Sequence, residues 1–368
     1  MRDIGFGVVG TGYMGKAHSV ALKSVGTVFG TNLRPVCEMI CATTEEGAKA
    51  KAAEYGYRRS TADWRELVND PKVEAVSIAS PQWTHREIAL AAFAAGKPVF
   101  CEKPLGETVD DSLAMVAAAE ESGLPNMVGF NYIRTPASQL ALEMIEAGEL
   151  GRIINMRAEH TEDFFSDPDE MGSWRTQKRS GGNMGDLSPH IINAVHRLMG
   201  PIASLVADIE TAYATRPGPD GPETVENDDQ ANILCRFASG VMGCISISRV
   251  STGRKMGFAY EITGSKGAIR FDQEDQNALR YYDASARTGR QGFTKILIGP
   301  DHPDYVNFCL GPGHGTGYND QIIIEMRDFL TAIETGAPVW PTFRVGLEVN
   351  QVIAAAETSA RERRWVDV

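Results

Sequence analysis

A glycine-rich turn near the N-terminus limits what this chain can fold into. The apolar run at residues 4–9 leads into Gly10-Thr11-Gly12-Tyr13-Met14-Gly15, and helical periodicity follows over residues 14–24. In a strand–turn–helix of this kind, the glycines let the backbone approach a pyrophosphate at the helix N-terminus. A GxGxxG pattern alone is weak evidence, and its place between a strand and a helix strengthens it. The turn predicts a dinucleotide-binding unit whose cofactor contacts include Gly10, Gly12, Tyr13, Met14 and Gly15.

Strand-like and helix-like segments alternate as far as residue 131. Further strand candidates lie at residues 35–41, 75–79, 98–100 and 127–131, and helix candidates lie at 47–55, 64–68, 87–95 and 112–121. This alternation is typical of a parallel, doubly wound sheet. We therefore predict an α/β fold with an N-terminal Rossmann domain at residues 1–131.

The pattern changes after residue 152, where strands follow one another with fewer helices between them. Strand candidates lie at 153–159, 204–212, 229–237, 241–249, 258–263 and 268–271, and helices at 189–199, 321–334 and 346–361. Glycine-containing turns separate the later strands, which favours an antiparallel meander. We predict a second α/β domain at residues 132–368, built on a large, open and mostly antiparallel sheet.

Composition excludes several classes of protein. The 368 residues carry a formal net charge of −12, which disfavours nucleic acid as a partner. No run of eighteen apolar residues occurs, and the N-terminus enters a strand without the regions of a signal peptide, so we expect a cytoplasmic protein without a membrane partner. The six cysteines form no CxxC pair, so neither a zinc site nor a disulfide framework is indicated, and we expect no metal.

The choice between NAD and NADP depends on the end of the second strand. An acidic residue is expected there to bind the adenosine ribose, but Ala42 occupies the position and Thr43 and Thr44 follow it. The missing acid removes a charge that would repel a 2′-phosphate, yet no arginine follows to pair with one. Glu38 lies in mid-strand and is expected to point elsewhere. Both cofactors stay open, with NAD favoured, and Ala42, Thr43 and Thr44 are the candidate ribose contacts.

The carboxyl ends of two further strands carry polar residues. Ligands bind at this edge of such sheets, so Ser80, Gln82 and His85, which follow the strand at 75–79, are candidate cofactor contacts. The strand at 98–100 ends in Glu102-Lys103-Pro104, where Glu102 and Lys103 could meet the reactive end of a dinucleotide. A lysine at a strand end is more often a solvated loop charge, so this assignment depends on the motifs that accompany it.

Three motifs together resemble the Gfo/Idh/MocA family of sugar and inositol oxidoreductases. They are Gly10-x-Gly12-x-x-Gly15-x-x-His18, Glu102-Lys103-Pro104 and Gly181-Gly182-x-x-Gly185-Asp186-x-x-x-His190. The segments Asn131-Tyr132-x-Arg134 and Ser173-Trp174-Arg175 are similar to the levoglucosan dehydrogenase-like members. The resemblance implies a substrate held between a Rossmann domain and an α/β domain, and a homodimer or homotetramer formed through the C-terminal sheet.

The same residues suggest a chemistry. Oxidation of a secondary alcohol removes the hydroxyl proton as hydride leaves the carbon, and an imidazole is a suitable base near neutral pH, so His190 is the candidate base. The matching family positions imply that Lys103 stabilises the developing alkoxide and that Asp186 orients the substrate or the cation. Alternatively, Lys103 takes the proton itself. The candidate substrate contacts are Lys103, Asn131, Tyr132, Arg134, Trp174, Arg175, Asp186 and His190.

Three functions fit these residues. The first is an NAD(P)-dependent dehydrogenase that oxidises a secondary hydroxyl of a cyclic sugar, anhydrosugar or inositol. The second is an oxidoreductive glycosidase that works through a 3-keto intermediate with transient reduction of the cofactor. The third, a non-catalytic dinucleotide sensor, would be expected to lack Lys103, Asp186 or His190, and all three are present.

Overall fold

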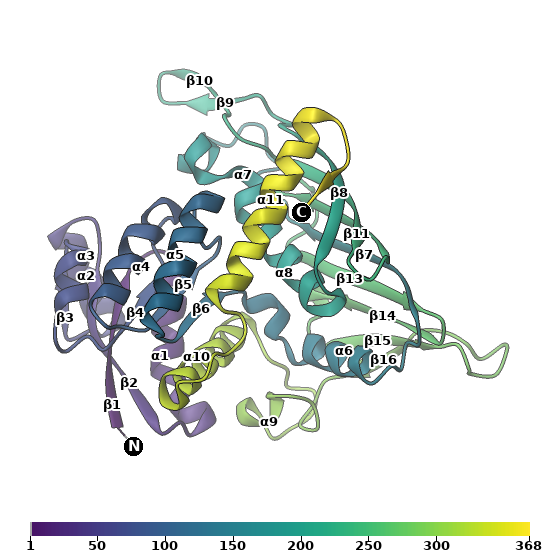
Figure 1. The fold of residues 1–368 in the computed structure, drawn as a ribbon, viewed down its shortest axis with the longest axis horizontal. Helices are drawn as coiled ribbons and strands as arrows, with labels where there is room; N and C mark the ends of the chain where they lie inside the picture. The colour runs from purple at the N-terminus through teal and green to yellow at the C-terminus, as the bar shows by residue number, and fades with distance from the viewer. Residues whose placement is uncertain (1) are drawn as a thin grey trace. The chain divides into compact units, whose positions relative to one another are not determined.

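The computed structural model describes residues 2–368, which divide into two compact units (Figure 1). The first contains the chain up to Asn131 together with Gly317–Asn350, and the second contains Tyr132–Thr316 and Gln351–Val368. The chain passes from the first unit to the second after residue 131. The return of residues 317–350 to the first unit differs from the expected division, because a return of this kind depends on contacts between residues far apart in the chain.

The first unit is a six-stranded parallel sheet. The strand order is β3-β2-β1-β4-β5-β6, so successive strands are added on one side of β1 and then, from β4 onward, on its other side. The predicted doubly wound sheet is therefore confirmed. β3 is absent from the sequence prediction, because its three residues, Arg59-Ser60-Thr61, are polar and give no apolar run. The strands are β1 (Arg2–Val9), β2 (Leu33–Cys41), β3 (Arg59–Thr61), β4 (Ala75–Ile78), β5 (Val99–Glu102) and β6 (Asn126–Gly129).

Helices in the first unit begin and end at recognisable capping residues. Thr108 and Asp111 form a capping box at the start of α5, and α1, α2 and α5 each end at a glycine in the left-handed region. The helices are α1 (Tyr13–Phe29), α2 (Glu45–Tyr55), α3 (Trp64–Asn69), α4 (His85–Ala94), α5 (Val109–Ser122) and α10 (Tyr318–Thr335), with a 3₁₀ turn at Gln82–Thr84.

Helix α10 belongs to this unit because it packs into its core. It lies against α1, and the ring of its Phe329 is 6.2 Å from that of Phe6 on β1 and 5.7 Å from that of Phe100 on β5. All three rings are fully buried. Burial of aromatic side chains of this size is among the larger contributions to a core, so α10 completes the Rossmann unit.

The second unit is built on a nine-stranded sheet. Its order is β16-β15-β14-β13-β7-β12-β11-β8-β17, and every neighbouring pair is antiparallel except β7 with β12. The expected open, mostly antiparallel sheet is confirmed. The strands are β7 (Ile153–Thr161), β8 (Ile202–Glu210), β11 (Gln230–Phe237), β12 (Met242–Ser248), β13 (Gly257–Gly264), β14 (Gly267–Asp272), β15 (Ala278–Asp283), β16 (Thr294–Leu297) and β17 (Val366–Asp367), and β9 (Thr215–Gly218) pairs with β10 (Gly221–Thr224) in a separate hairpin.

One face of this sheet is buried and the other is exposed. On β11 the alternate residues Ala231, Ile233, Cys235 and Phe237 are buried, whereas Asn232, Leu234 and Arg236 are exposed. Helix α8 contacts β7, and α6 contacts β14 and β15. The helices are α6 (Pro136–Glu146), α7 (Gly182–Asp186), α8 (Ser188–Met199), α9 (Tyr305–Phe308) and the second half of α11 (Phe343–Glu362). No helix within residues 2–368 is both long enough and apolar enough to cross a membrane.

Candidate active site

Two glycines of the turn, Gly10 and Gly15, pack against backbone atoms, whereas Gly12 faces open space. A Cβ on Gly10, whose φ is +110°, would lie 2.3 Å from the carbonyl oxygen of Ala79, and one on Gly15 would lie 2.2 Å from the carbonyl oxygen of Gly10. A Cβ on Gly12 would meet no atom within 4 Å. Helix α1 starts at the next residue without a side-chain cap, so its first amides are placed as in a pyrophosphate site. The geometry fits a dinucleotide.

Tyr13 and Met14, at the start of α1, lie next to Tyr318, the first residue of α10. Tyr13 is 71% exposed, and its ring centroid is 5.6 Å from that of Tyr318. The Tyr318 hydroxyl is 3.2 Å from the Met14 sulfur. Tyr318 is thus a neighbour of the glycine turn that the sequence does not identify, because 304 residues separate it from Met14.

The predicted ribose end of the site carries no charged side chain at residues 42–44. Ala42 follows β2, and the hydroxyl of Thr44 caps α2 by accepting from the Gly47 amide at 3.1 Å. Glu38 is buried and pairs with Arg58 at 3.1 Å and with Arg59 at 2.9 Å. Its carboxylate is therefore occupied away from the end of the strand, as the sequence predicts.

His85 joins two loops at the carboxyl edge of the sheet. Its Nε2 lies 2.9 Å from the carbonyl oxygen of Ser80, after β4, and its Nδ1 lies 3.0 Å from that of Pro104, after β5. Burial lowers the pKa of His85, and its hydrogen bonds to carbonyl oxygens oppose that shift. Ser80 bonds to Thr84 at 2.6 Å, and Gln82 lies in the 3₁₀ turn between them. His85 thus holds the Ser80 turn against the loop that follows Lys103.

Hydrogen bonds in the interior of the first unit hold the Glu102 carboxylate in place. Its Oε1 lies 2.8 Å from Nε2 of His18, whose Nδ1 is 2.5 Å from the Ser77 hydroxyl. Its Oε2 accepts from the Lys103 amide at 3.3 Å. Both His18 and Glu102 are buried. The pair fixes the end of β5, and with it the backbone of Lys103.

Asp186 and His190 flank a break between two helices. Asp186 ends α7, His190 lies in the first turn of α8, and Leu187 separates the helices. The carbonyl oxygen of Leu187 lies 2.9 Å from Nδ1 of the buried His160, whose Nε2 is 3.1 Å from Glu162. His160 thus fixes this junction, a role that its position on a distant strand conceals in the sequence.

The second unit gathers several of the predicted substrate contacts. Arg175 Nη1 lies 3.1 Å from Asp186 Oδ2, and the guanidinium is 4.9 Å from the ring of Trp174, which is half exposed. The ring of His190 lies 4.5 Å from that of Tyr132.

Of the other three predicted substrate contacts, Lys103 lies in the first unit after β5, and Arg134 and Asn131 form the following hydrogen bonds. Arg134 donates to Gln139 at 3.2 Å. Asn131 belongs to the first unit, where it donates to Gln321 of α10 at 2.8 Å. The structure therefore brings Trp174, Arg175 and Asp186 together, and Tyr132 with His190.

A doubly wound unit with a glycine turn at a helix N-terminus, together with an open-sheet unit that presents a carboxylate, a guanidinium and an imidazole, is the arrangement expected of a dinucleotide-dependent oxidoreductase. The family model for the oxidoreductase family with an NAD-binding Rossmann fold matches residues 4–130, and that for the Gfo/Idh/MocA C-terminal domain matches residues 138–270. The chain belongs to the Gfo/Idh/MocA family, which confirms the resemblance carried by the three motifs.

The sequence similarity to individual relatives covers essentially the whole chain. It is 37% identical to the levoglucosan dehydrogenase of Pseudarthrobacter phenanthrenivorans, over 100% of this chain and 99% of the relative. It is 27% identical to the inositol 2-dehydrogenase of Rhizobium meliloti, over 99% and 98% of the two chains. A solved structure of levoglucosan dehydrogenase in complex with NADH and levoglucosan superposes with a TM-score of 0.97 at 37% identity, covering 100% of both chains.

Proposed function

We propose that this oxidoreductase uses NAD to oxidise a secondary hydroxyl of a cyclic sugar or anhydrosugar. The observation that carries the proposal is the cluster of Trp174, Arg175 and Asp186, which combines an exposed aromatic face with a cation and a carboxylate. An aromatic face can pack on the C–H surface of a sugar ring, and charged groups hydrogen-bond its hydroxyls. The full-length similarity to levoglucosan dehydrogenase, solved with NADH and levoglucosan, supports this substrate class.

The residues divide the reaction between them. His190 accepts the hydroxyl proton, Lys103 stabilises the developing alkoxide, and Asp186, held by Arg175, orients the ring. When bound, the nicotinamide supplies the hydride acceptor. In the alternative assignment, Lys103 takes the proton and His190 orients the hydroxyl.

The test is a panel of cyclic polyols, sugars, anhydrosugars and glycosides, each offered with NAD and with NADP. Formation of NADH in step with a keto product supports the proposal. Hydrolysis of a glycoside without net reduction of the cofactor would replace it with the oxidoreductive glycosidase. Binding of dinucleotide without turnover of any compound would indicate a sensor.

We also propose a homodimer or homotetramer formed through the exposed face of the second unit's sheet. Leu234 on β11 and Met242 on β12 are each about half exposed on neighbouring strands of that face. Apolar residues gathered on an exposed sheet face are typical of an interface between subunits. Leu234→Glu combined with Met242→Glu should lower the mass measured by light scattering to that of a smaller species, and an unchanged mass would contradict the proposal.

A further inference from the structure

The loop that carries Arg175 contains little regular structure of its own. It runs from Ser173 to Gly181 and consists of two 3₁₀ turns, Trp174–Thr176 and Lys178–Ser180. The ion pair between Arg175 and Asp186 leaves the two side chains 43% and 33% exposed, and pairs as exposed as this add little stability. The loop must therefore be held in place by other contacts.

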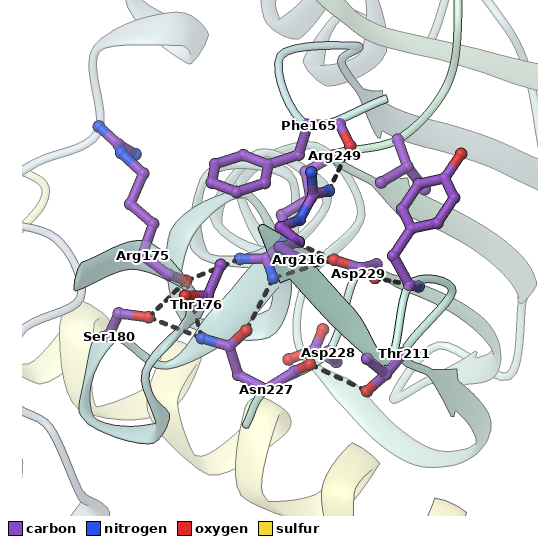
Figure 2. Close-up of polar contacts among 12 residues, drawn as sticks. Phe165, Arg175, Thr176, Ser180, Thr211, Arg216, Asn227, Asp228, Asp229 and Arg249 are labelled. Atoms are coloured by element: carbon purple, nitrogen blue, oxygen red, sulfur yellow. Dashed lines mark hydrogen bonds and ion pairs between the residues drawn. The ribbon is translucent and has the colours of Figure 1, made fainter. Parts of the chain in front are cut away.

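We infer that Asn227 is a positioning residue for substrate binding, acting through the Arg175 loop. The inference rests on the proposed function, in which Arg175 and Asp186 contact the sugar. Asn227 Nδ2 lies 2.8 Å from the carbonyl oxygen of Arg175 and 2.7 Å from the hydroxyl of Ser180 (Figure 2). It also lies 2.8 Å from the carbonyl oxygen of Gln177. One side chain thus joins the start, middle and end of the loop.

The orientation of the Asn227 amide follows from its partners. Its Oδ1 accepts from Arg249 Nη2 at 2.7 Å, while its Nδ2 faces two backbone carbonyl oxygens. A guanidinium only donates hydrogen bonds and a carbonyl only accepts them, so the reversed amide would lose these contacts. Arg249 Nη1 donates to the same Arg175 carbonyl at 3.1 Å, which gives this oxygen a second donor.

Arg249 is itself fixed in the interior. Its guanidinium is 3% exposed and lies 2.9 Å from Asp229 Oδ1, and Asp229 is fully buried. Asp229 Oδ2 accepts from the Tyr213 amide at 3.0 Å, and the ring of Phe165 lies 4.9 Å from the guanidinium. A buried, fully bonded pair of this kind gives a rigid anchor for Asn227.

The residue after Asn227 holds the other end of the ion pair. Asp228 Oδ2 accepts from the Met184 amide at 3.0 Å, within the helix α7 that ends at Asp186. Asn227 therefore holds the loop that carries the guanidinium, and Asp228 holds the helix that carries the carboxylate. Two consecutive residues, which precede β11, thus fix the relative positions of Arg175 and Asp186.

Asn227→Asp is the sharpest test, because it keeps the size of the side chain and its contact with Arg249 while removing both hydrogens that face the loop. We expect KM for the sugar to rise about tenfold, with kcat within about threefold and the Kd of NADH unchanged. Asn227→Ala gives a second variant with the same expectation. Thr211→Val is the matched control, because it removes only the hydrogen bond that the Thr211 hydroxyl donates to the backbone carbonyl oxygen of Asn227 at 2.9 Å.

A double-mutant cycle separates positioning from general damage to the fold. If Asn227 acts through the loop that carries Arg175, Asn227→Ala raises KM less in the Arg175→Ala background than in the unsubstituted protein. Independent, multiplying effects of the two substitutions would overturn the inference, as would an equal rise in KM for Thr211→Val. Unchanged KM in Arg175→Ala alone, for every accepted sugar, would instead refute the role that the proposed function gives to Arg175.

Discussion

Asp228 makes the stability of the second unit depend on pH in a direction opposite to that of most carboxylates. Burial of the carboxyl raises the pKa of Asp228 from its ordinary 3.8 to about 7, although its hydrogen bond from the Met184 amide and the charge of Arg249 favour the ionised form. Glu357, on α11, adds to the rise. The folded state thus keeps the proton of Asp228 at pH values where the unfolded chain has released it.

The sign and size of the effect follow from this difference. Below about pH 4 the group is protonated in both states and costs nothing. Between pH 4 and pH 7 the folded state binds the extra proton, so the free energy of unfolding falls as the pH rises. A rise of about three units at 1.36 kcal/mol each gives a loss on the order of 4 kcal/mol above pH 7. This is an upper limit, because Asp228 is only half-buried.

Asp228→Asn should remove this dependence, because an amide oxygen still accepts from the Met184 amide but carries no charge. We expect the variant and the unsubstituted protein to unfold at the same urea concentration near pH 4, and the variant to become progressively more stable up to pH 8. Tryptophan fluorescence reports on this unit through Trp174 and Trp365. The same stability difference at pH 4 and pH 8, or a less stable variant at pH 8, would refute the reasoning.

Other predictions concern the first unit. Lys103→Met should lower turnover at least about a thousandfold and leave NADH binding, measured by fluorescence, unchanged. The control Lys72→Met, at an exposed loop position, should change neither turnover nor NADH binding. Turnover of Lys103→Met near that of the unsubstituted protein would show that Lys103 takes no part in the reaction. Gly12→Ala should weaken NADH binding at least tenfold without lowering the melting temperature. Gly10→Ala should lower the free energy of unfolding by at least about 2 kcal/mol, because Gly10 has a φ of +110° and lies close to the backbone. A loss of stability in Gly12→Ala with none in Gly10→Ala would contradict the turn geometry. Ala42→Asp should lower kcat/KM with NADP at least about tenfold and leave that with NAD nearly unchanged, because a carboxylate repels a 2′-phosphate; equal changes with both cofactors would place residue 42 away from the ribose.

The fold follows from the sequence where a local pattern carries it. The apolar runs of β1, β4 and β5 and the glycine turn before α1 predict a parallel sheet because each element is specified by neighbouring residues. The position of β7 between β12 and β13, and the packing of α10 on α1, depend on partners more than 80 residues away. No local period encodes such pairings, so the sequence predicts a simple meander and a single break between the domains.

The candidate site divides in the same way. Lys103, Asp186 and His190 stand in short motifs that can be recognised, whereas His160 and Asn227, which hold parts of the site, do not. His160 fixes the carbonyl between Asp186 and His190 from a strand, and Asn227 holds the Arg175 loop from a turn. Histidine and asparagine have these roles through hydrogen bonds to residues that are distant in the sequence, which leave no spacing to read.

The contact between His18 and Glu102 explains why two motifs separated by 84 residues belong together. His18 closes the glycine motif on α1, Glu102 opens the Glu-Lys-Pro motif at the end of β5, and their side chains meet at 2.8 Å in the buried interior, with Ser77 of β4 on the other ring nitrogen. A buried carboxylate without this partner would be costly, and so would the imidazole without its two hydrogen-bond partners. The pair therefore fixes the N-terminal helix of the dinucleotide turn relative to the strand end that carries Lys103. His18→Ala should then disturb both functions at once, weakening NADH binding and lowering turnover, whereas a loss of turnover with unchanged NADH binding would show that the two motifs are held independently.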